Sequence, residues 1–501
     1  MTENSTAGAA PASPRRTARD ALLLLALTAT AILPHGYHYG FQDGAIWLPP
    51  ISKLLDPSLY PHDAIFFLAQ TSTTVFPQLV AYSVKLTRLP LDVTVFLWHL
   101  LSIFLVLCGC LRLARRCFAR PAAQWAAVTA VWAARLFIIA GTKLNLMDHY
   151  LHPRDLATGA LLFGLVATLD GRLMALAWIA LAATLHPTMA LYGAFHLAFQ
   201  VRKLPPSGAA MCAVPPLWAA GFVAVPNQAW HEVLATRPYL FPLRWHWYEW
   251  LSVPVVLFAL VGFARVARRG ALPLVEHISG RLVLAGLAGT AASLFITTVP
   301  AFERLIPAEP MRTLHFVYLL FVLLGGGLLG QYFLLARPGR WLALFLPICL
   351  AFVISLRSFY PASPHIEWPG GVPRNAWVEG FDWVRRNTPR KALSALNPMH
   401  MDLPGEDSHG FRFFAERSML ADGVKDRAAT AIFPGLAYTW RQQVRDQESW
   451  REFSLEDFRR LKRKYGVNWI VLERNGPRVR PGDPGLPCPF TNDAVAVCRI
   501  E

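Results

Sequence analysis

The sequence predicts a mainly α-helical, polytopic membrane protein with a small α/β domain at its C-terminal end. Three observations predict this class. Of the 501 residues, 54% are hydrophobic and only 16% are charged, whereas soluble proteins carry about a quarter charged residues. The apolar residues form blocks of about 18 residues or more, enough to cross roughly 30 Å of hydrocarbon. The charged residues lie between these blocks, and no such block follows residue 358.

The net charge of +16 comes largely from short basic clusters at the ends of the apolar blocks. Such clusters are typical of cytoplasmic loops under the positive-inside rule. No basic face with interleaved aromatic residues occurs elsewhere, which argues against nucleic acid as a partner. The clusters are Arg15, Arg16 and Arg19; Arg112, Arg115, Arg116 and Arg120; Arg202 and Lys203; Arg265, Arg268 and Arg269; and Arg337 and Arg340.

Placing these clusters in the cytoplasm predicts about eleven spans in a bacterial inner membrane, with the N-terminus inside and the C-terminal domain outside. Residues 1–19 are expected to be a disordered cytoplasmic tail. The first apolar run is interpreted as an uncleaved span, with a cleaved signal peptide as the alternative. Within the region at about 45–90, the stretch from Thr73 to Leu86 is apolar but short and is broken by Pro77, which favours interfacial helices. The predicted spans are 20–36, 91–111, 122–142, 155–169, 173–186, 188–201, 209–226, 251–264, 282–300, 314–335 and 341–358.

The transmembrane domain is therefore assigned to residues 20–358 and an extracytoplasmic α/β domain to 359–501. The second domain opens with a linker rich in proline and glycine. An amphipathic helix is predicted around Trp377 to Trp383, a second from Ser454 to Lys464, and a buried strand over 466–472.

Cys488 and Cys498 are the only cysteines after residue 358. In an exported domain they are expected to form a disulfide. Two buried free thiols are the alternative.

Acids, histidines and arginines are costly near a bilayer, so those at the outer ends of the predicted spans require an explanation. On the predicted threading, four separate segments present such residues to the outer face. Their convergence predicts one shared polar cavity. The segments are 35–43, 148–154, 186–187 and 309–312.

The chain resembles the GT-C superfamily of glycosyltransferases, which includes protein O-mannosyltransferases and the aminoarabinose transferase of lipid A. The resemblance lies in an acid after the first span within Gly-Phe-Gln-Asp-Gly (40–44), a second acidic outer loop (148–155), and a span ending in Leu-Ala-Arg-Arg-Cys-Phe-Ala-Arg (113–120). His-Pro-Arg (152–154) and Gly-Phe-Arg-Phe-Phe-Ala-Glu-Arg (410–417) also resemble uncharacterised bacterial membrane proteins grouped near these enzymes.

The resemblance implies transfer of a sugar from a polyprenyl-phosphate donor to an unknown glycan, lipid or protein acceptor at the outer face. Transfer to a hydroxyl needs a base, for which Asp43 is the first candidate. Asp148 would orient the acceptor or a histidine. Guanidinium groups bind phosphate oxygens in bidentate fashion, so Arg154 and Arg312 are expected at the donor phosphate. His152 and His186 would donate to the same group.

Each of these roles has a structural alternative. Asp43 suits the N-cap of an interfacial helix, and both arginines suit snorkelling to lipid headgroups. Asp148, His149 and His152 have a spacing that permits metal ligation, but Pro153 indicates that a helix starts there, and no metal is expected. Trp247 and Tyr248 fit an aromatic belt, with weak sugar contact as the alternative.

Two further questions stay open in the sequence. A charged cluster in the outer domain is expected to be a solvated helix edge, with contact to an acceptor glycan or to the membrane domain as alternatives. A lipid or glycolipid transporter and a non-catalytic scaffold are the alternative functions. The absence of a Walker A loop, a nucleophile elbow and a Rossmann fingerprint argues against an ATP-driven pump and familiar hydrolases. The cluster comprises Arg412, Glu416, Arg417, Asp422 and Lys425, around Phe411, Phe413 and Phe414.

Overall fold

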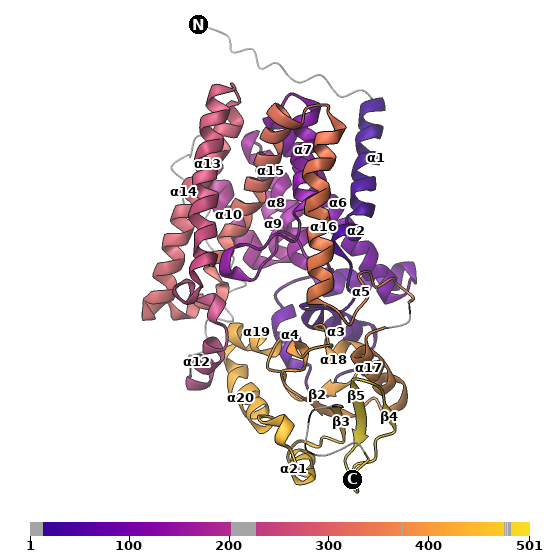
Figure 1. The fold of residues 1–501 in the computed structure, drawn as a ribbon. Coiled ribbons are helices and arrows are strands. Elements are labelled where there is room, and N and C mark those ends of the chain that lie inside the picture. The colour runs from indigo at the N-terminus through magenta and orange to yellow at the C-terminus, as the bar shows by residue number, and fades with distance from the viewer. Residues whose placement is uncertain (1–13, 202–226, 372–373, 475, 477, 479–481) are drawn as a thin grey trace.

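The computed structural model describes residues 14–201, 227–371, 374–474, 476, 478 and 482–501. These residues form a helical bundle with a smaller domain at one end, and the N-terminus lies at the opposite end of the bundle (Figure 1). The predicted span 209–226 and the basic pair Arg202 and Lys203 fall outside the described residues.

The described part of the chain contains six helices that are long and apolar enough to cross a membrane. The mainly helical class and its membrane character are thus confirmed, while the number of eleven spans stays a prediction. These helical stretches are Thr17–His35, Leu91–Cys117, Trp247–Arg269, Pro273–Thr298, Pro310–Leu334 and Pro338–Phe359.

The bundle also contains four shorter helices. In chain order its helices are α1 (Pro14–Thr30), α2 (Ile32–His35), α6 (Leu91–Cys117), α7 (Pro121–Ala133), α8 (Pro153–Leu169), α9 (Met174–Leu185), α10 (Pro187–Gln200), α13 (Trp247–Arg269), α14 (Pro273–Thr298), α15 (Leu314–Leu329) and α16 (Pro338–Phe359).

The helix predicted over 122–142 is shorter in the structure and ends at Ala133. Arg135 follows it and is 1% exposed. Its guanidinium donates to the carbonyl oxygen of Asp148 at 2.5 Å and lies 3.3 Å from Nε2 of His99. The chain leaves the helix here because a buried guanidinium needs acceptors, and the loop that follows supplies one of them.

Three contacts join helix ends at the bundle end nearest the N-terminus. Arg115 at the end of α6 pairs with Asp20 of α1, and Arg116 pairs with Asp170 after α8. Arg120 donates to the carbonyl oxygen of Gln331, in the π-helical turn Gly330–Leu334 that continues α15. The arginine-rich end of α6 therefore lies at the opposite end of the bundle from the C-terminal domain (Figure 1).

Three short helices occupy the region predicted to be interfacial: α3 (Gly44–Leu55), α4 (Ile65–Thr71) and α5 (Phe76–Thr87). The longest have 12 residues, which at 1.5 Å per residue span only about 18 Å. None of the three is among the six helices that could cross a membrane. They lie between the bundle and the C-terminal domain (Figure 1).

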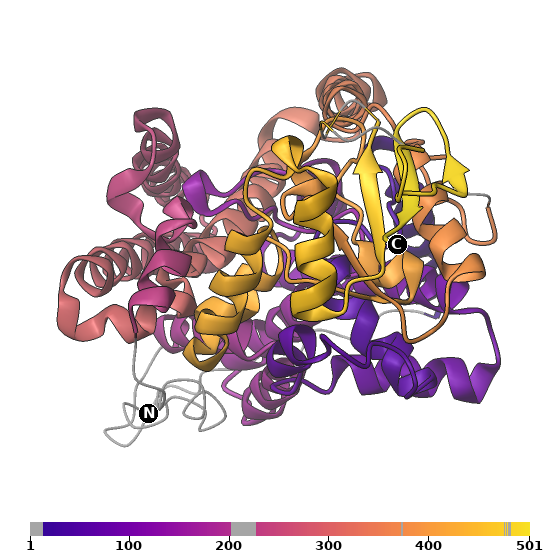
Figure 2. The ribbon, with the colours of Figure 1, turned by 90° about the horizontal axis from the view of Figure 1, so that it is seen from below.

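The C-terminal domain is built on a five-stranded mixed sheet of order β2-β1-β3-β5-β4. β1 pairs in parallel with β2 and β3, and β5 pairs antiparallel with β3 and β4. Viewed from the domain's outer end, helices lie beside the strands (Figure 2). The elements are α12 (Gln228–Ala235), which precedes the domain in sequence, α17 (Ala376–Asn387), β1 (Leu393–Leu396), α18 (Phe411–Ala415), β2 (Ser418–Met419), α19 (Asp426–Ile432), α20 (Ala437–Asp446), α21 (Leu455–Tyr465), β3 (Trp469–Glu473), β4 (Phe490–Thr491) and β5 (Val495–Arg499).

Local signals in this domain are present as predicted. Ser454 and Asp457 form a capping box at the start of α21, and Gly466 ends that helix in the left-handed conformation. The buried strand β3 follows directly. Cys488 and Cys498 are joined in a disulfide.

Candidate functional site

A polar cavity of about 730 Å3 lies between the bundle, the short helices and the C-terminal domain. Segments far apart in the sequence line it, from the loop before α3 to the turn before α19. The six residues predicted for catalysis or donor binding all line this cavity: Asp43, Asp148, His152, Arg154, His186 and Arg312.

Asp43 precedes α3 but its side chain does not cap the helix. Instead, Oδ1 accepts a hydrogen bond from Nζ of Lys425 at 2.8 Å, and Oδ2 lies 3.5 Å from Nε2 of His152. A third of the Asp43 side chain is exposed to the cavity. Burial opposes its ionisation, but the Lys425 ammonium and the His152 ring hold the pKa of Asp43 well below its usual range. Asp43 is therefore an accessible carboxylate at neutral pH.

His152 is the N-cap of α8, and its Nδ1 accepts the backbone N–H of Arg154 at 2.9 Å. Nε2 of the same ring faces the Asp43 carboxylate and also accepts the indole N–H of Trp47 at 3.3 Å. The ring stacks on His186 with centroids 5.7 Å apart. These contacts hold the imidazole at one position beside Asp43.

Asp148 and Arg154 form an ion pair in which each side chain is 3% exposed. The sequence did not predict this pair, and the roles expected for Asp148 and Arg154 towards acceptor and donor stay predictions. A buried guanidinium with a carboxylate partner does not snorkel to headgroups, so that alternative is wrong for Arg154.

Arg312 belongs to a second pairing, in which two arginines share one carboxylate. Glu309 accepts from Nε of Arg312 at 2.5 Å and from Arg237 at 3.1 Å. Arg237 also donates from Nε to the Tyr239 hydroxyl at 2.9 Å. Two guanidiniums and one carboxylate leave an excess positive charge on this wall. The Arg312 side chain is 17% exposed and faces the cavity.

Lys143 and Arg427 add further positive charge to the cavity lining. The Lys143 ammonium lies 5.6 Å from the centroid of the Tyr239 ring. Arg427 donates to the backbone carbonyls of Val424 and Thr236. Neither has a carboxylate partner within the described part of the chain. Sequence reasoning missed both residues and Arg237, because no local pattern relates their loops to Arg312.

Trp247 and Tyr248 do not belong to the cavity lining. They are 76% and 56% exposed at the start of α13, which is compatible with an aromatic belt. Of residues 245–250, only Glu249 lines the cavity. Its carboxylate accepts the backbone N–H of His246 in a capping box.

Within the described residues, no group of three or more His, Cys, Asp or Glu side chains is arranged to hold a metal ion. Two members of the Asp148–His149–His152 set are engaged elsewhere, whereas neither ring nitrogen of His149 has a hydrogen-bond partner among the described residues. The Asp148 carboxylate faces Arg154, and Nδ1 of His152 accepts a backbone N–H. Pro153 predicted that a helix starts here, and His152 is indeed the N-cap of α8.

A second groove of about 830 Å3 lies on the other side of the segment 37–43, against the linker 364–371 and α17. Glu367 of the linker is one of the acidic residues that line this groove. Glu367 accepts the backbone N–H of Tyr39 at 2.7 Å and the Nε2 proton of His409 at 3.0 Å, and Nδ1 of His38 lies 3.5 Å away. These bonds tie the C-terminal domain to the segment that carries Asp43.

The outer-domain cluster expected at a solvated helix edge is buried in part. Arg412 is 5% exposed, Arg417 4% and Asp422 3%, so the solvated edge is wrong for these three. Lys425 lines the cavity and reaches Asp43, 382 residues away in the chain. Of the two alternatives, the structure therefore shows contact with the membrane domain. The only signal in the sequence was the density of charged residues around Phe411, Phe413 and Phe414.

No family model matches this chain, and no curated protein matches its sequence.

Proposed function

We propose that the protein is an integral membrane glycosyltransferase. It transfers a sugar from a polyprenyl-phosphate donor to an envelope acceptor at the outer face of a bacterial inner membrane. In this proposal the chain has about eleven spans, the N-terminus lies inside and the C-terminal domain outside. The single observation that supports it most is the joint lining of one cavity by an ionised carboxylate, Asp43, and an arginine wall centred on Arg312.

The two parts of the cavity suit the two demands of the reaction. The acceptor oxygen attacks the anomeric carbon, the bond from that carbon to the phosphate oxygen breaks, and the hydroxyl proton passes to Asp43. The polyprenyl phosphate leaves with an added negative charge. Arg312 and Arg237, which share one carboxylate, together with Lys143, offer the positive charge that stabilises this group.

The roles within the predicted set differ from one another on this proposal. Asp43 is the base, and Arg312 takes the phosphate. His152 orients the Asp43 carboxylate through Nε2, and His186 supports the His152 ring by stacking. Asp148 and Arg154 form a buried pair that holds the cavity wall.

The test replaces Asp43→Asn and Arg312→Ala in the native host and measures its surface glycans and glycoproteins by mass spectrometry. Both variants are expected to lose the glycan product, because one lacks the base and the other the phosphate contact. Asp493→Asn and Arg244→Ala are matched controls, since both residues are exposed and lie outside the cavity lining. Unchanged glycans in both folded cavity variants would refute the catalytic assignment.

A scaffold predicts a different pattern. Removal of residues 359–501 would abolish its function, whereas substitutions of Asp43 would have no effect. The comparison of Asp43→Asn with the truncated chain therefore separates the two functions.

A further inference from the structure

Three carboxylates surround one guanidinium beneath the turn that carries Lys425. Nε of Arg412 donates to Asp63 at 2.5 Å, and its terminal nitrogens donate to both oxygens of Asp426 at 2.8 Å each. Asp422 Oδ2 lies 3.5 Å from the same guanidinium. All four side chains are 5% exposed or less. We call these four residues the Arg412 cage.

The cage joins three segments that are distant in sequence. Asp63 lies in the loop before α4, Arg412 lies in α18, and Asp422 and Asp426 flank the turn into α19. Asp63 also accepts the backbone N–H of Met419 at the end of β2. Because an unpaired buried charge costs several kcal/mol, loss of one member leaves the others without compensation. The cage therefore holds the interfacial region and the C-terminal domain in one arrangement.

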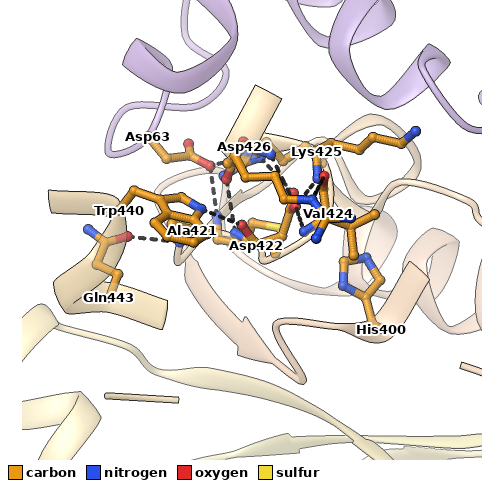
Figure 3. Close-up of polar contacts among 12 residues, drawn as sticks. Asp63, His400, Ala421, Asp422, Val424, Lys425, Asp426, Trp440 and Gln443 are labelled. Atoms are coloured by element: carbon orange, nitrogen blue, oxygen red, sulfur yellow. Dashed lines mark hydrogen bonds and ion pairs between the residues drawn. The ribbon is translucent and has the colours of Figure 1, made fainter. Parts of the chain in front are cut away.

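Asp422 fixes the backbone of the turn that bears Lys425. Its Oδ1 accepts the N–H groups of Val424 at 2.8 Å, Lys425 at 2.5 Å and Asp426 at 3.2 Å. Figure 3 shows Lys425 beside Asp422 and Asp426, with its side chain extending away from them. The ammonium group at its end reaches Asp43.

Two acceptors meet the Lys425 ammonium in the cavity. It donates to Oδ1 of Asp43 at 2.8 Å and to Oε1 of Gln42 at 2.9 Å. The Lys425 side chain is 13% exposed, so its position depends on the turn that carries it. Because a lysine side chain has a flexible four-carbon stem, a fixed backbone is needed to hold its charge at one carboxylate.

We propose that the Arg412 cage positions Lys425 against Asp43, so that the C-terminal domain supplies a functional residue of the cavity. Lys425 keeps Asp43 ionised and oriented, and Arg412, Asp63 and Asp422 are positioning residues that act through it. The chemical role of Asp43 rests on the proposed function, whereas the positioning of Lys425 does not.

The first experiment measures this position without any activity. Asp43→Cys and Lys425→Cys are combined in a background in which all cysteines except Cys488 and Cys498 are serine. A short bismaleimide is expected to cross-link the two thiols in native membranes. Adding Asp63→Asn is expected to reduce the cross-link to the level of either single-cysteine chain, whereas Asp493→Asn leaves it unchanged. A cross-link that persists with Asp63→Asn overturns the proposal.

A folding control accompanies this experiment. The Asp63→Asn chain is purified in detergent, and its melting is compared with that of Asp493→Asn. If Asp63→Asn does not fold, Arg412→Lys takes its place, since it keeps the buried charge but loses the bidentate contact with Asp426. An undiminished cross-link in folded Arg412→Lys also overturns the proposal.

The second experiment uses the pH profile of glycan transfer. A cation beside a carboxylate lowers its pKa by about 1–3 units, so Lys425→Ala is expected to move the acidic limb of the profile upward by a similar amount. Asp63→Asn should reproduce this shift, and Lys425→Arg should largely prevent it. A uniform loss of activity at every pH, without a shift, contradicts the positioning role. If Asp63→Asn loses the cross-link but the unmodified protein transfers no sugar, the proposed function is refuted and the positioning of Lys425 is retained.

Discussion

Gly40 shows how one backbone position sets the segment that carries Asp43. Its φ is +70°, in the left-handed region. A Cβ atom at this position would lie 2.7 Å from Phe413 and 2.8 Å from Phe414. The glycine thus permits both the turn and the close approach of α18, which contains Arg412.

Gly40→Ala is expected to reduce both thermal stability and glycan transfer. The left-handed conformation alone costs an alanine roughly 1–2 kcal/mol, and the contact with the two rings adds to this. Gly405→Ala is the matched control, because Gly405 has φ +84° but no atom within 4 Å of the added Cβ. Melting temperature in detergent and surface glycans are measured for both. Equal effects of the two substitutions would show that the ring contacts contribute nothing.

The linker 364–371 and the segment 37–43 are two elements joined by ionisable groups. Both ring nitrogens of His409 face acceptors: Nε2 faces Glu367 at 3.0 Å, and Nδ1 faces the carbonyl oxygen of Glu406 at 2.9 Å. Burial disfavours a charged imidazole, but the Glu367 carboxylate raises the pKa of His409 to about 9. Burial likewise opposes ionisation of Glu367, yet His409 and His38 lower its pKa to about 2. The structure thus contains an ion pair between the linker and the segment that precedes α18.

The pH dependence of stability follows from the raised pKa of His409 and the lowered pKa of Glu367. The contribution of His409 is fully present below its ordinary pKa of about 6.5 and is lost as the pH rises through about 9. That of Glu367 is present above about 4.5 and is lost as the pH falls through about 2. We therefore expect the melting temperature to fall between pH 6.5 and 9.

His409→Gln is expected to flatten this dependence, whereas His62→Gln, at an exposed histidine, is expected to retain it. Melting in detergent across this pH range measures both. A slope in His409→Gln as steep as in the unmodified chain would contradict the assignment. The ionisable groups that face His409 are Glu367 and Glu406, and Glu367 also lies 3.5 Å from Nδ1 of His38.

The arginine-rich end of α6 and the segment that carries Asp43 lie at opposite ends of the bundle. The pairs of Arg115 and Arg116 lie at the end of the bundle near the N-terminus, and Asp43 lies at the end that faces the C-terminal domain (Figure 1). In the proposed topology, the positive-inside rule places the first end in the cytoplasm. A disulfide between Cys488 and Cys498 suits the oxidising outer compartment.

This orientation predicts the accessibility of single cysteines in intact cells whose outer membrane has been made permeable. Asp493→Cys should react with a membrane-impermeant maleimide from outside, and Arg120→Cys only after the inner membrane is opened. The background lacks the cysteines outside the disulfide. Labelling of both positions from the same side would refute the orientation and, with it, a donor site at the outer leaflet.

Much of the helical framework could be predicted from the sequence, because its signals are local. Apolar blocks predicted α6 and α14 to α16, and the cap at Ser454 predicted α21. The short extent of α7 could not be predicted, since the chain leaves that helix to satisfy Arg135, whose partners lie in other segments. The apolar composition of the sequence continues past Arg135 and therefore predicts a longer helix than α7.

The amino-acid sequence also placed Asp43, His152, His186 and Arg312 at one end of the bundle, because helices of alternating direction bring alternate ends together. It did not reveal which charges pair. Arg154 with Asp148, and Lys425 with Asp43, are contacts made by packing. Helix periods and caps depend on neighbours three or four residues away, whereas an ion pair across 382 residues depends on how the whole chain folds.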